Sequence, residues 1–228
     1  MDIQTRVLAA TAVAMLALPA TVGARDLGFN YVEANYINVD ADIDERFVDD
    51  VGFFALESDT GGGLHVAAAV EIWDGFHLFG EYSQAEQDLD LIEDNFLFRG
   101  DFDVVRWRAG VGFSAPMSDM MQVYGRLTFD STEFRDQTIE GQNLGSDKDD
   151  GLGAEAGLLW AASRELHLQG YVRYTEVGEI DLEEFDTFDS DVLAGVFARW
   201  YLTEQFAMQL GYEGGAISTG FLGVRFAF

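Results

Sequence analysis

The feature that most constrains the fold is an alternation of polar and apolar residues with a period of two. Residues 165–176 show it most clearly, because the apolar and small residues of this segment share one parity and the polar ones the other. Successive side chains of a β-strand point to opposite faces, so this pattern predicts a strand. Helical periodicity is absent. The apolar face comprises Leu166, Leu168, Gly170, Val172 and Tyr174.

The same pattern recurs along the chain and predicts ten strands of 9 to 14 residues. Strands in ordinary sandwiches are shorter, about 5–6 residues. A tilted strand that crosses a bilayer needs about 9–11 residues. We therefore expect an all-β fold, a transmembrane antiparallel up-and-down β-barrel of about ten strands, with eight or twelve as alternatives. The strands are expected near 28–38, 61–72, 76–87, 101–114, 121–134, 150–162, 165–177, 189–202, 205–213 and 217–228.

The connections between these segments alternate in length, as the turns and loops of an outer-membrane barrel do. Short turns are expected at 73–75, 115–120, 163–164 and 203–204. Longer loops are expected at 39–60, 88–100, 135–149 and 178–188. The short turns then lie on the periplasmic side and the long loops outside the cell.

Large aromatic residues cluster beside the short turns. Amphipathic rings are most stable at the boundary between hydrocarbon and headgroups, so we interpret this cluster as the periplasmic aromatic girdle. Ordinary core packing in a soluble β protein is the alternative. The girdle comprises Trp73, Phe76, Phe113, Trp160, Trp200, Phe206 and Phe228.

Composition excludes several other classes of protein. The formal net charge of −28 argues against nucleic acid as a partner, because affinity for nucleic acid comes from neutralising phosphates. The absence of cysteine excludes a disulfide scaffold and thiolate metal sites. The 25 glycines and 14% aromatic residues indicate packed β structure instead of disorder.

Residues 1–24 have the organisation of a secretory signal peptide. Arg6 gives the positive start, residues 7–18 are apolar, and small residues at 22–24 offer a cleavage site after Ala24. The apolar run is short of the about 20 residues that a membrane-spanning helix needs. We expect an exported protein in which residues 25–228 form the barrel domain of the cell outer membrane.

Four segments resemble a known family in the same order along the chain. They are FNYVEANY at 29–36, FHLFGEYS at 76–83, RWRAGVGFS at 106–114 and GFLGVRFAF at 220–228. The chain resembles the small outer-membrane barrels of xanthomonad-type bacteria, within the class of OmpA/OmpX-like barrels. That family was once proposed to act in quorum sensing and plant immunity. The segment RFVDDVGFFALES at 46–58 makes the first outer loop longer than in the family.

The last strand alternates apolar residues on one face and ends on phenylalanine. Such a terminal strand resembles the signal that the barrel-assembly machinery recognises during biogenesis, and it also suits a final lipid-facing strand. The residues concerned are Leu222, Val224, Phe226 and Phe228.

If the apolar faces meet lipid, the charged faces converge inside the barrel. Charges on the lipid face cost about 2–4 kcal/mol for Arg or Lys at mid-bilayer, so an inward network is expected. Arg forks can bind carboxylates at two points and fill the lumen as a plug. A charged, water-filled conduit for small solutes is the alternative. The residues expected there are Glu33, Glu71, Glu81, Arg106, Arg108, Arg126, Glu155, Arg173, Arg199, Glu213 and Arg225.

Catalysis has weak support in the sequence. His65, with Glu57 and Asp59 upstream, could serve as a general base, but no serine-bearing turn or acidic pair accompanies it. His77 and His167 lie near the periplasmic ends of their strands. No metal-ligand spacing is present. We expect no catalytic, cofactor or metal site, and a hydrogen-bonded role for His65 in the lumen.

The four long loops carry 21 acidic residues against Arg46, Arg99, Arg135 and Lys148. They could bind divalent cations loosely, and such cations could bridge to lipopolysaccharide phosphates. A solvated surface that resists aggregation is the simpler interpretation. Apolar residues interrupt the acids at 47–56 and 91–98, where they either mark a contact surface or pack within extended hairpins.

Together these features predict a non-enzymatic outer-membrane barrel with a structural or surface-interaction role. Its partners would be membrane lipid, lipopolysaccharide and the assembly machinery. A narrow porin-like channel for small solutes is the first alternative. An outer-leaflet enzyme that acts on lipopolysaccharide or peptides is the second.

Overall fold

The computed structural model describes residues 27–40, 44–48, 53–58, 60–93, 96–139, 142–177, 181–182, 185–186, 191–215 and 217–228. The predicted signal peptide, residues 1–24, lies outside these residues. No helix among the described residues is long and apolar enough to span a membrane.

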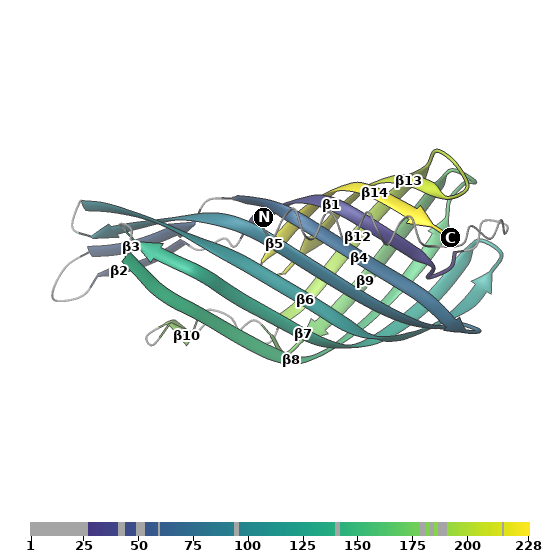
Figure 1. Ribbon diagram of the computed structural model, residues 1–228, viewed down its shortest axis with the longest axis horizontal. Coiled ribbons are helices and arrows are strands. Elements are labelled where there is room, and N and C mark those ends of the chain that lie inside the picture. Colours follow the sequence, from purple (N-terminus) through teal and green to yellow (C-terminus); the bar gives the residue numbers. More distant parts are fainter. Residues whose placement is uncertain are drawn as a thin grey trace, which may run out of the picture.

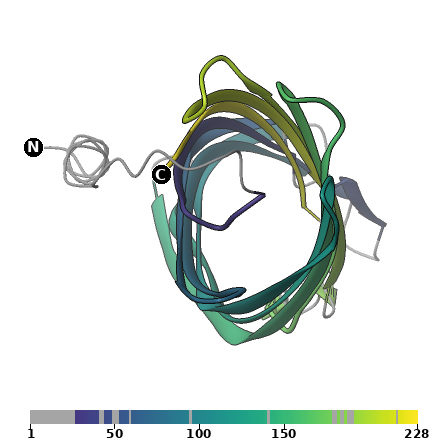
Figure 2. The same ribbon diagram turned by 90° about the vertical axis from the view of Figure 1, so that its right-hand side faces the viewer.

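Ten antiparallel strands close into a barrel (Figures 1 and 2). Each strand pairs with its neighbours in the chain, and β1 closes the ring by pairing with both β4 and β14. This confirms the predicted all-β barrel of ten strands. The strands of the ring are β1 (Tyr31–Asp40), β4 (Gly61–Trp73), β5 (Phe76–Glu93), β6 (Phe96–Ser118), β7 (Met121–Ile139), β8 (Gln142–Ala161), β9 (Leu166–Thr175), β12 (Asp191–Tyr201), β13 (Phe206–Gly214) and β14 (Ser218–Ala227).

Strands β5 to β8 are longer than the sequence predicts. They contain 18, 23, 19 and 20 residues, and they extend beyond the rest of the barrel as a wall on one side (Figure 1). The prediction of loops at 88–100 and 135–149 is therefore wrong over most of both segments. Their acidic residues suit a solvated loop, yet the backbone pairing continues through both segments, from Glu93↔Phe96 on one hairpin to Ile139↔Gln142 on the next.

The segment predicted as the first outer loop also contains strands. β2 (Asp44–Val48) and β3 (Phe53–Ser58) form a hairpin, and β3 continues the sheet by pairing with the outer half of β5. Two residues each in β10 (Asp181–Leu182) and β11 (Phe185–Asp186) form a minimal hairpin in the last long connection. The segments at 47–56 and 91–98 therefore belong in large part to extended strands.

Charge pairs lie on the outer face of the wall. Arg135 donates a hydrogen bond of 2.5 Å to Glu133, which holds the pKa of that carboxyl below its ordinary value. Lys148 does the same for Asp150 over 2.8 Å. Both pairs are exposed, so each contributes little to stability.

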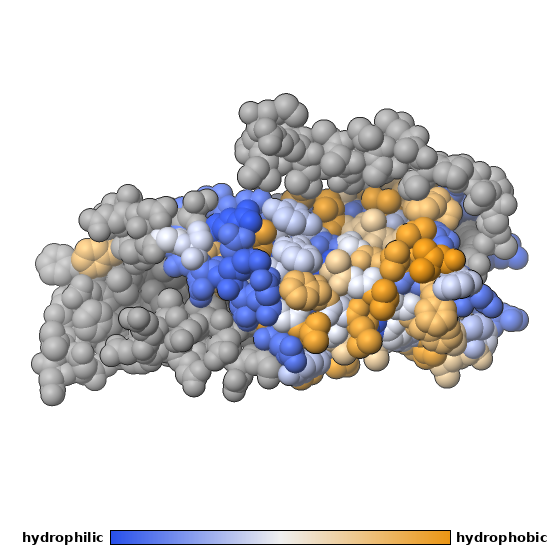
Figure 3. Space-filling view, turned by 60° about the horizontal axis from the view of Figure 1, so that its bottom comes forward, coloured by the Kyte–Doolittle hydropathy of each residue, from blue (hydrophilic) through white to orange (hydrophobic). Residues whose placement is uncertain are grey.

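The outer surface of the ring carries an apolar band (Figure 3). At the edge of the band next to the short turns lie the aromatic residues of the predicted periplasmic girdle, and we call this edge the lower one. Trp73 is the most exposed of them, at 74%, and Phe76 contacts Phe113 with 4.8 Å between ring centroids. The side chains of Trp160, Trp200 and Phe206 are exposed at the same level, and Phe228 is half-buried.

A second aromatic belt, which the sequence analysis did not identify, closes the upper edge of the band. Trp107 pairs with Tyr82 across β5 and β6 and contacts Phe129 with 5.5 Å between ring centroids. Directly above this belt the outward positions become polar, for example at Gln84 and Asp103. We infer that the band between the two belts faces hydrocarbon. The belt consists of Tyr36, Tyr82, Trp107, Phe129, Tyr174 and Tyr212.

The lipid-facing band can be tested at its middle. Val196 lies four residues from Trp200 in the lower girdle, and its side chain is 61% exposed. Val196→Arg should lower the free energy of unfolding in lipid vesicles by about 2–4 kcal/mol, because the charge must enter hydrocarbon. Urea titration followed by tryptophan fluorescence measures this change. Glu86→Arg, above the upper belt, is the control and should change stability by less than about 0.5 kcal/mol. Equal effects would contradict the placement of the band.

Candidate functional site: a charged network in the lumen

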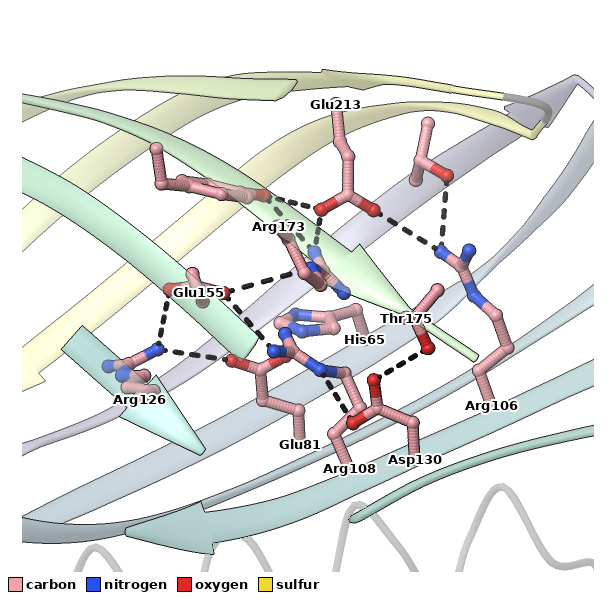
Figure 4. A network of polar contacts seen from close by, with 12 residues as sticks. His65, Glu81, Arg106, Arg108, Arg126, Asp130, Glu155, Arg173, Thr175 and Glu213 are labelled. Atoms are coloured by element: carbon pink, nitrogen blue, oxygen red, sulfur yellow. Dashed lines mark hydrogen bonds and ion pairs between the residues drawn. The ribbon is translucent and has the colours of Figure 1, made fainter. Parts of the chain in front are cut away.

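Six arginines and five carboxylates lie inside the barrel, and we call them the lumen network. Figure 4 shows the part of it around Arg108 and Arg173. They come from nine of the ten strands, and all but Arg106 and Glu81 are buried. The strand pleat places them there: side chains alternate between the two faces of the sheet, and each of these residues occupies a position that faces the lumen. The network consists of Arg106, Arg108, Arg126, Arg173, Arg199, Arg225, Glu33, Glu81, Asp130, Glu155 and Glu213.

Arg108 on β6 is the centre of the network. Its guanidinium nitrogens lie 2.9 Å from Glu81 on β5, 3.3 Å from Asp130 on β7 and 3.2 Å from Glu155 on β8. One cation thus ties four adjacent strands together through three carboxylates. The fork of the guanidinium suits this role, because it offers five donors in a fixed plane.

Arg126 extends the network toward the periplasmic end. It donates to Glu155 over 3.3 Å and to the Tyr31 hydroxyl over 3.2 Å. Its guanidinium also lies 4.2 Å from the centroid of the Phe79 ring. Aromatic faces attract a desolvated guanidinium, so the rings compensate in part for the water that Arg126 has lost.

Two further groups complete the network. Arg173 forms an ion pair with Glu213, which also accepts a hydrogen bond of 2.5 Å from the Tyr171 hydroxyl. On the β1–β14 side, Glu33 lies 3.6 Å from Arg225 and 4.0 Å from Arg199. The Arg199 Nε atom donates to Gln209 over 3.0 Å.

The structure places ten of the eleven residues predicted for the lumen in this network. Glu71 is the exception. Its carboxylate accepts a hydrogen bond of 3.1 Å from the Gly75 backbone N–H, so it caps the β4–β5 turn at the periplasmic rim. Glu71 does not join the network because β4 has already passed the level of Glu81 at Ala67, so the Glu71 side chain lies on the periplasmic side of the arginines.

Asp130 is the network carboxylate that sequence reasoning missed. It accepts from Arg108 and from the Thr175 hydroxyl, the latter over 2.9 Å. Its parity on β7 is that of Arg126, so the alternation alone could have identified it as an inward acid. The close approach of Gly153 makes room for it, because a Cβ atom there would lie 2.4 Å from the Asp130 carboxylate.

The chain segment before β1 enters the periplasmic end of the lumen. The strand begins at Tyr31, three residues later than predicted, and Phe29 lies inside the barrel, 1% exposed. Its ring stacks on His77 with 3.9 Å between centroids and lies edge-on to Tyr124. Figure 2 shows this segment turning inward from the wall into the mouth of the ring. Phe29 and its partners therefore form an apolar floor beneath the network.

A cavity of about 110 Å³ lies within the lumen. This volume is enough for several water molecules. It is lined both by charged residues of the network, such as Arg106 and Glu213, and by apolar residues of the outer half, such as Phe197 and Phe221. The lumen is thus crossed by side chains without being completely filled.

His65 lies buried in the lumen beside the network. Its Nδ1 atom is 2.9 Å from the Asn35 side-chain amide, and its ring meets Phe221 edge-on at 5.3 Å. No serine hydroxyl is recorded within hydrogen-bond distance of this ring among the described residues. In that part of the chain there is also no cluster of three or more His, Cys, Asp or Glu residues that could hold a metal ion.

The strength of the network can be measured at its centre. Arg108→Gln leaves three carboxylates, two of them buried, without their shared cation, so it should lower the free energy of unfolding by about 3–5 kcal/mol. Arg135→Gln breaks an exposed pair and is the matched control, with an expected loss below about 1 kcal/mol. Urea titration in vesicles compares the two. A loss at Arg108 no larger than that at Arg135 would show that the network does not hold the barrel together.

The sequence matches no protein-family model and no curated protein. Among solved structures, the chain is similar to the outer membrane protein OprG from Pseudomonas aeruginosa, with 12% identity over 87% of this chain and 94% of that one, at a TM-score of 0.49. It is similar to the KdgM porin, with 10% identity over 86% and 99% of the two chains, at a TM-score of 0.46. The attachment invasion locus protein Ail of Yersinia pestis shares 16% identity over 87% and 97%, at 0.41. At these identities and scores the neighbours carry no function over to this chain.

Proposed function

We propose that this chain is a small, non-enzymatic barrel of the Gram-negative outer membrane that acts at the cell surface. The observation that carries the proposal is the lumen network, in which Arg108 alone binds three carboxylates from three neighbouring strands at 2.9–3.3 Å. A lumen crossed in this way serves to hold the ring together. The outer strands and loops are then the part of the protein that can contact other molecules.

The outer side has the chemistry of a contact surface. Apolar residues lie among acids in the segment 46–58, part of which pairs with β5 as an extension of the wall. Exposed apolar groups with a polar surround mark contact sites. Membrane lipid and lipopolysaccharide are the expected environment of the band. Divalent cations can link the acidic outer residues to lipopolysaccharide phosphates, which those residues would otherwise repel. The terminal strand, with Phe228, supplies the signal for assembly.

A narrow channel for small solutes is the second candidate. The cavity of about 110 Å³ favours it, because part of the lumen is free of side chains. Phe29 and the Arg108 cluster oppose it, since both lie across the path between the two mouths.

Conductance of the refolded protein in planar bilayers separates the two candidates. The closed lumen predicts no discrete openings for the native chain. Simultaneous replacement of Glu81, Arg108 and Glu155 by alanine removes the centre of the network, so small openings should arise. Arg126 and Asp130 lose their ion pairs in this variant, so its folding is checked first by the shift of the unboiled protein on a gel. Discrete openings of the native chain would overturn the closed lumen in favour of the channel.

The surface role can be tested in the segment 46–56. Replacing its 11 residues by a Gly/Ser linker should reduce attachment of cells to surfaces several-fold, because the apolar residues among the acids are lost. The same replacement at 140–150, also 11 residues and acidic but with Leu144 as its one apolar side chain, is the matched control. Surface display of both variants is checked with an antibody tag. Unchanged attachment in the first variant would count against the surface role.

A further inference from the structure

We propose that the lumen binds one small monocarboxylate between Arg106 and Arg173. The site would lie on the outer side of the network, within the cavity that both arginines line (Figure 4). This inference does not depend on the surface role, because it concerns the lumen alone.

The first argument is the weak pairing of Arg106. Among the described residues its one recorded carboxylate partner within 4.0 Å is Glu213, whose Oε1 atom lies 3.8 Å away while its Oε2 atom is paired with Arg173. Arg108, in contrast, has three carboxylates within 3.3 Å. One monovalent anion would give Arg106 a close partner of its own.

The second argument is unused hydrogen-bonding capacity. The Arg173 side chain is 9% exposed, yet its Nε atom has no hydrogen-bond partner among the described residues, and the nearest recorded carboxylate oxygen, on Glu155, is 3.7 Å away. Arg106 makes one long hydrogen bond, of 3.4 Å, to the Thr219 hydroxyl. A buried donor without an acceptor is costly, so both side chains favour an added acceptor group.

The third argument is the shape and lining of the cavity. Its volume of about 110 Å³ suffices for a molecule of a few heavy atoms. Hydroxyl groups of Ser83 and Thr132 line it together with the apolar side chains of Phe197, Phe221 and Ile217. A carboxylate matches the planar fork of a guanidinium at two points, and an apolar wall accommodates a short alkyl chain. These features together specify a short-chain monocarboxylate instead of a cation or a multiply charged phosphate.

The position of Arg106 indicates entry from the outer side. It pairs in register with Ser83 and Thr132 and directly precedes Trp107, which belongs to the upper aromatic belt. Its side chain is 22% exposed, whereas the other five network arginines are between 3% and 9% exposed. Phe29 closes the opposite end. The site is therefore a pocket that opens toward the cell exterior.

Binding of sodium butyrate to the full barrel in detergent micelles tests the proposal. Saturation-transfer NMR, with empty micelles as the blank, should show saturable binding of butyrate and none of butylammonium. Arg106→Gln should weaken butyrate binding at least tenfold. Arg135→Gln, on the outer wall, should leave it unchanged. The shift of the unboiled protein on a gel reports that each variant is folded.

A second variant separates loss of the site from damage to the barrel. Glu213→Gln removes the carboxylate that competes for both guanidiniums, so it should tighten butyrate binding at least threefold, which a damaged barrel would not do. The proposal is overturned if the native barrel shows no saturable binding, if Arg106→Gln binds as well as the native chain, or if butylammonium binds equally. Butyrate binding and conductance are separate measurements, so these outcomes do not depend on whether the lumen conducts.

Discussion

The absence of water in hydrocarbon is the constraint on which this structure depends. Every backbone N–H and C=O in the apolar band must find a partner within the protein, so the sheet has to close on itself. Pairing of β1 with both β4 and β14 achieves that closure. Once the ring is closed, each side chain points either to lipid or into the lumen. The charged residues of the band are therefore restricted to the lumen.

The lumen therefore becomes the place where charge must be neutralised without much water. Arg108 illustrates the solution, since three carboxylates surround one guanidinium and the network spans four strands. Such a cluster is weak evidence for net stability, because desolvation offsets much of the attraction between the charges. Its clearer consequence is geometric: each wrong register of β5 to β8 would leave a charge in the lumen unpaired. The network thus selects one register for these strands.

The sequence predicts the parts of the fold that follow from the polar–apolar alternation along each strand. Ten strands, their antiparallel order and the inward arginines all derive from alternation, which lipid on one side enforces. Backbone pairing in the outer parts of β5 to β8 leaves no such signal in the sequence, so the strands at 96–100 and 135–139 escaped prediction. The alternation pattern also cannot predict which side chains meet across the ring. Nothing in the local sequence shows that Asp130 meets Arg108 or that Phe29 stacks on His77.

The lumen and the outer wall share one asymmetry. At the periplasmic end Phe29, Tyr124 and Leu159 form an apolar floor, whereas the outer half holds the cavity and the most exposed guanidinium, that of Arg106. Outside the ring, the additional strand length also lies on the outer side, in β5 to β8 and the hairpin of β2 and β3. A conduit would need accessible polar surface at both mouths. The apolar floor at one end and the extra strand length at the other are the features on which the proposed role at the cell surface rests.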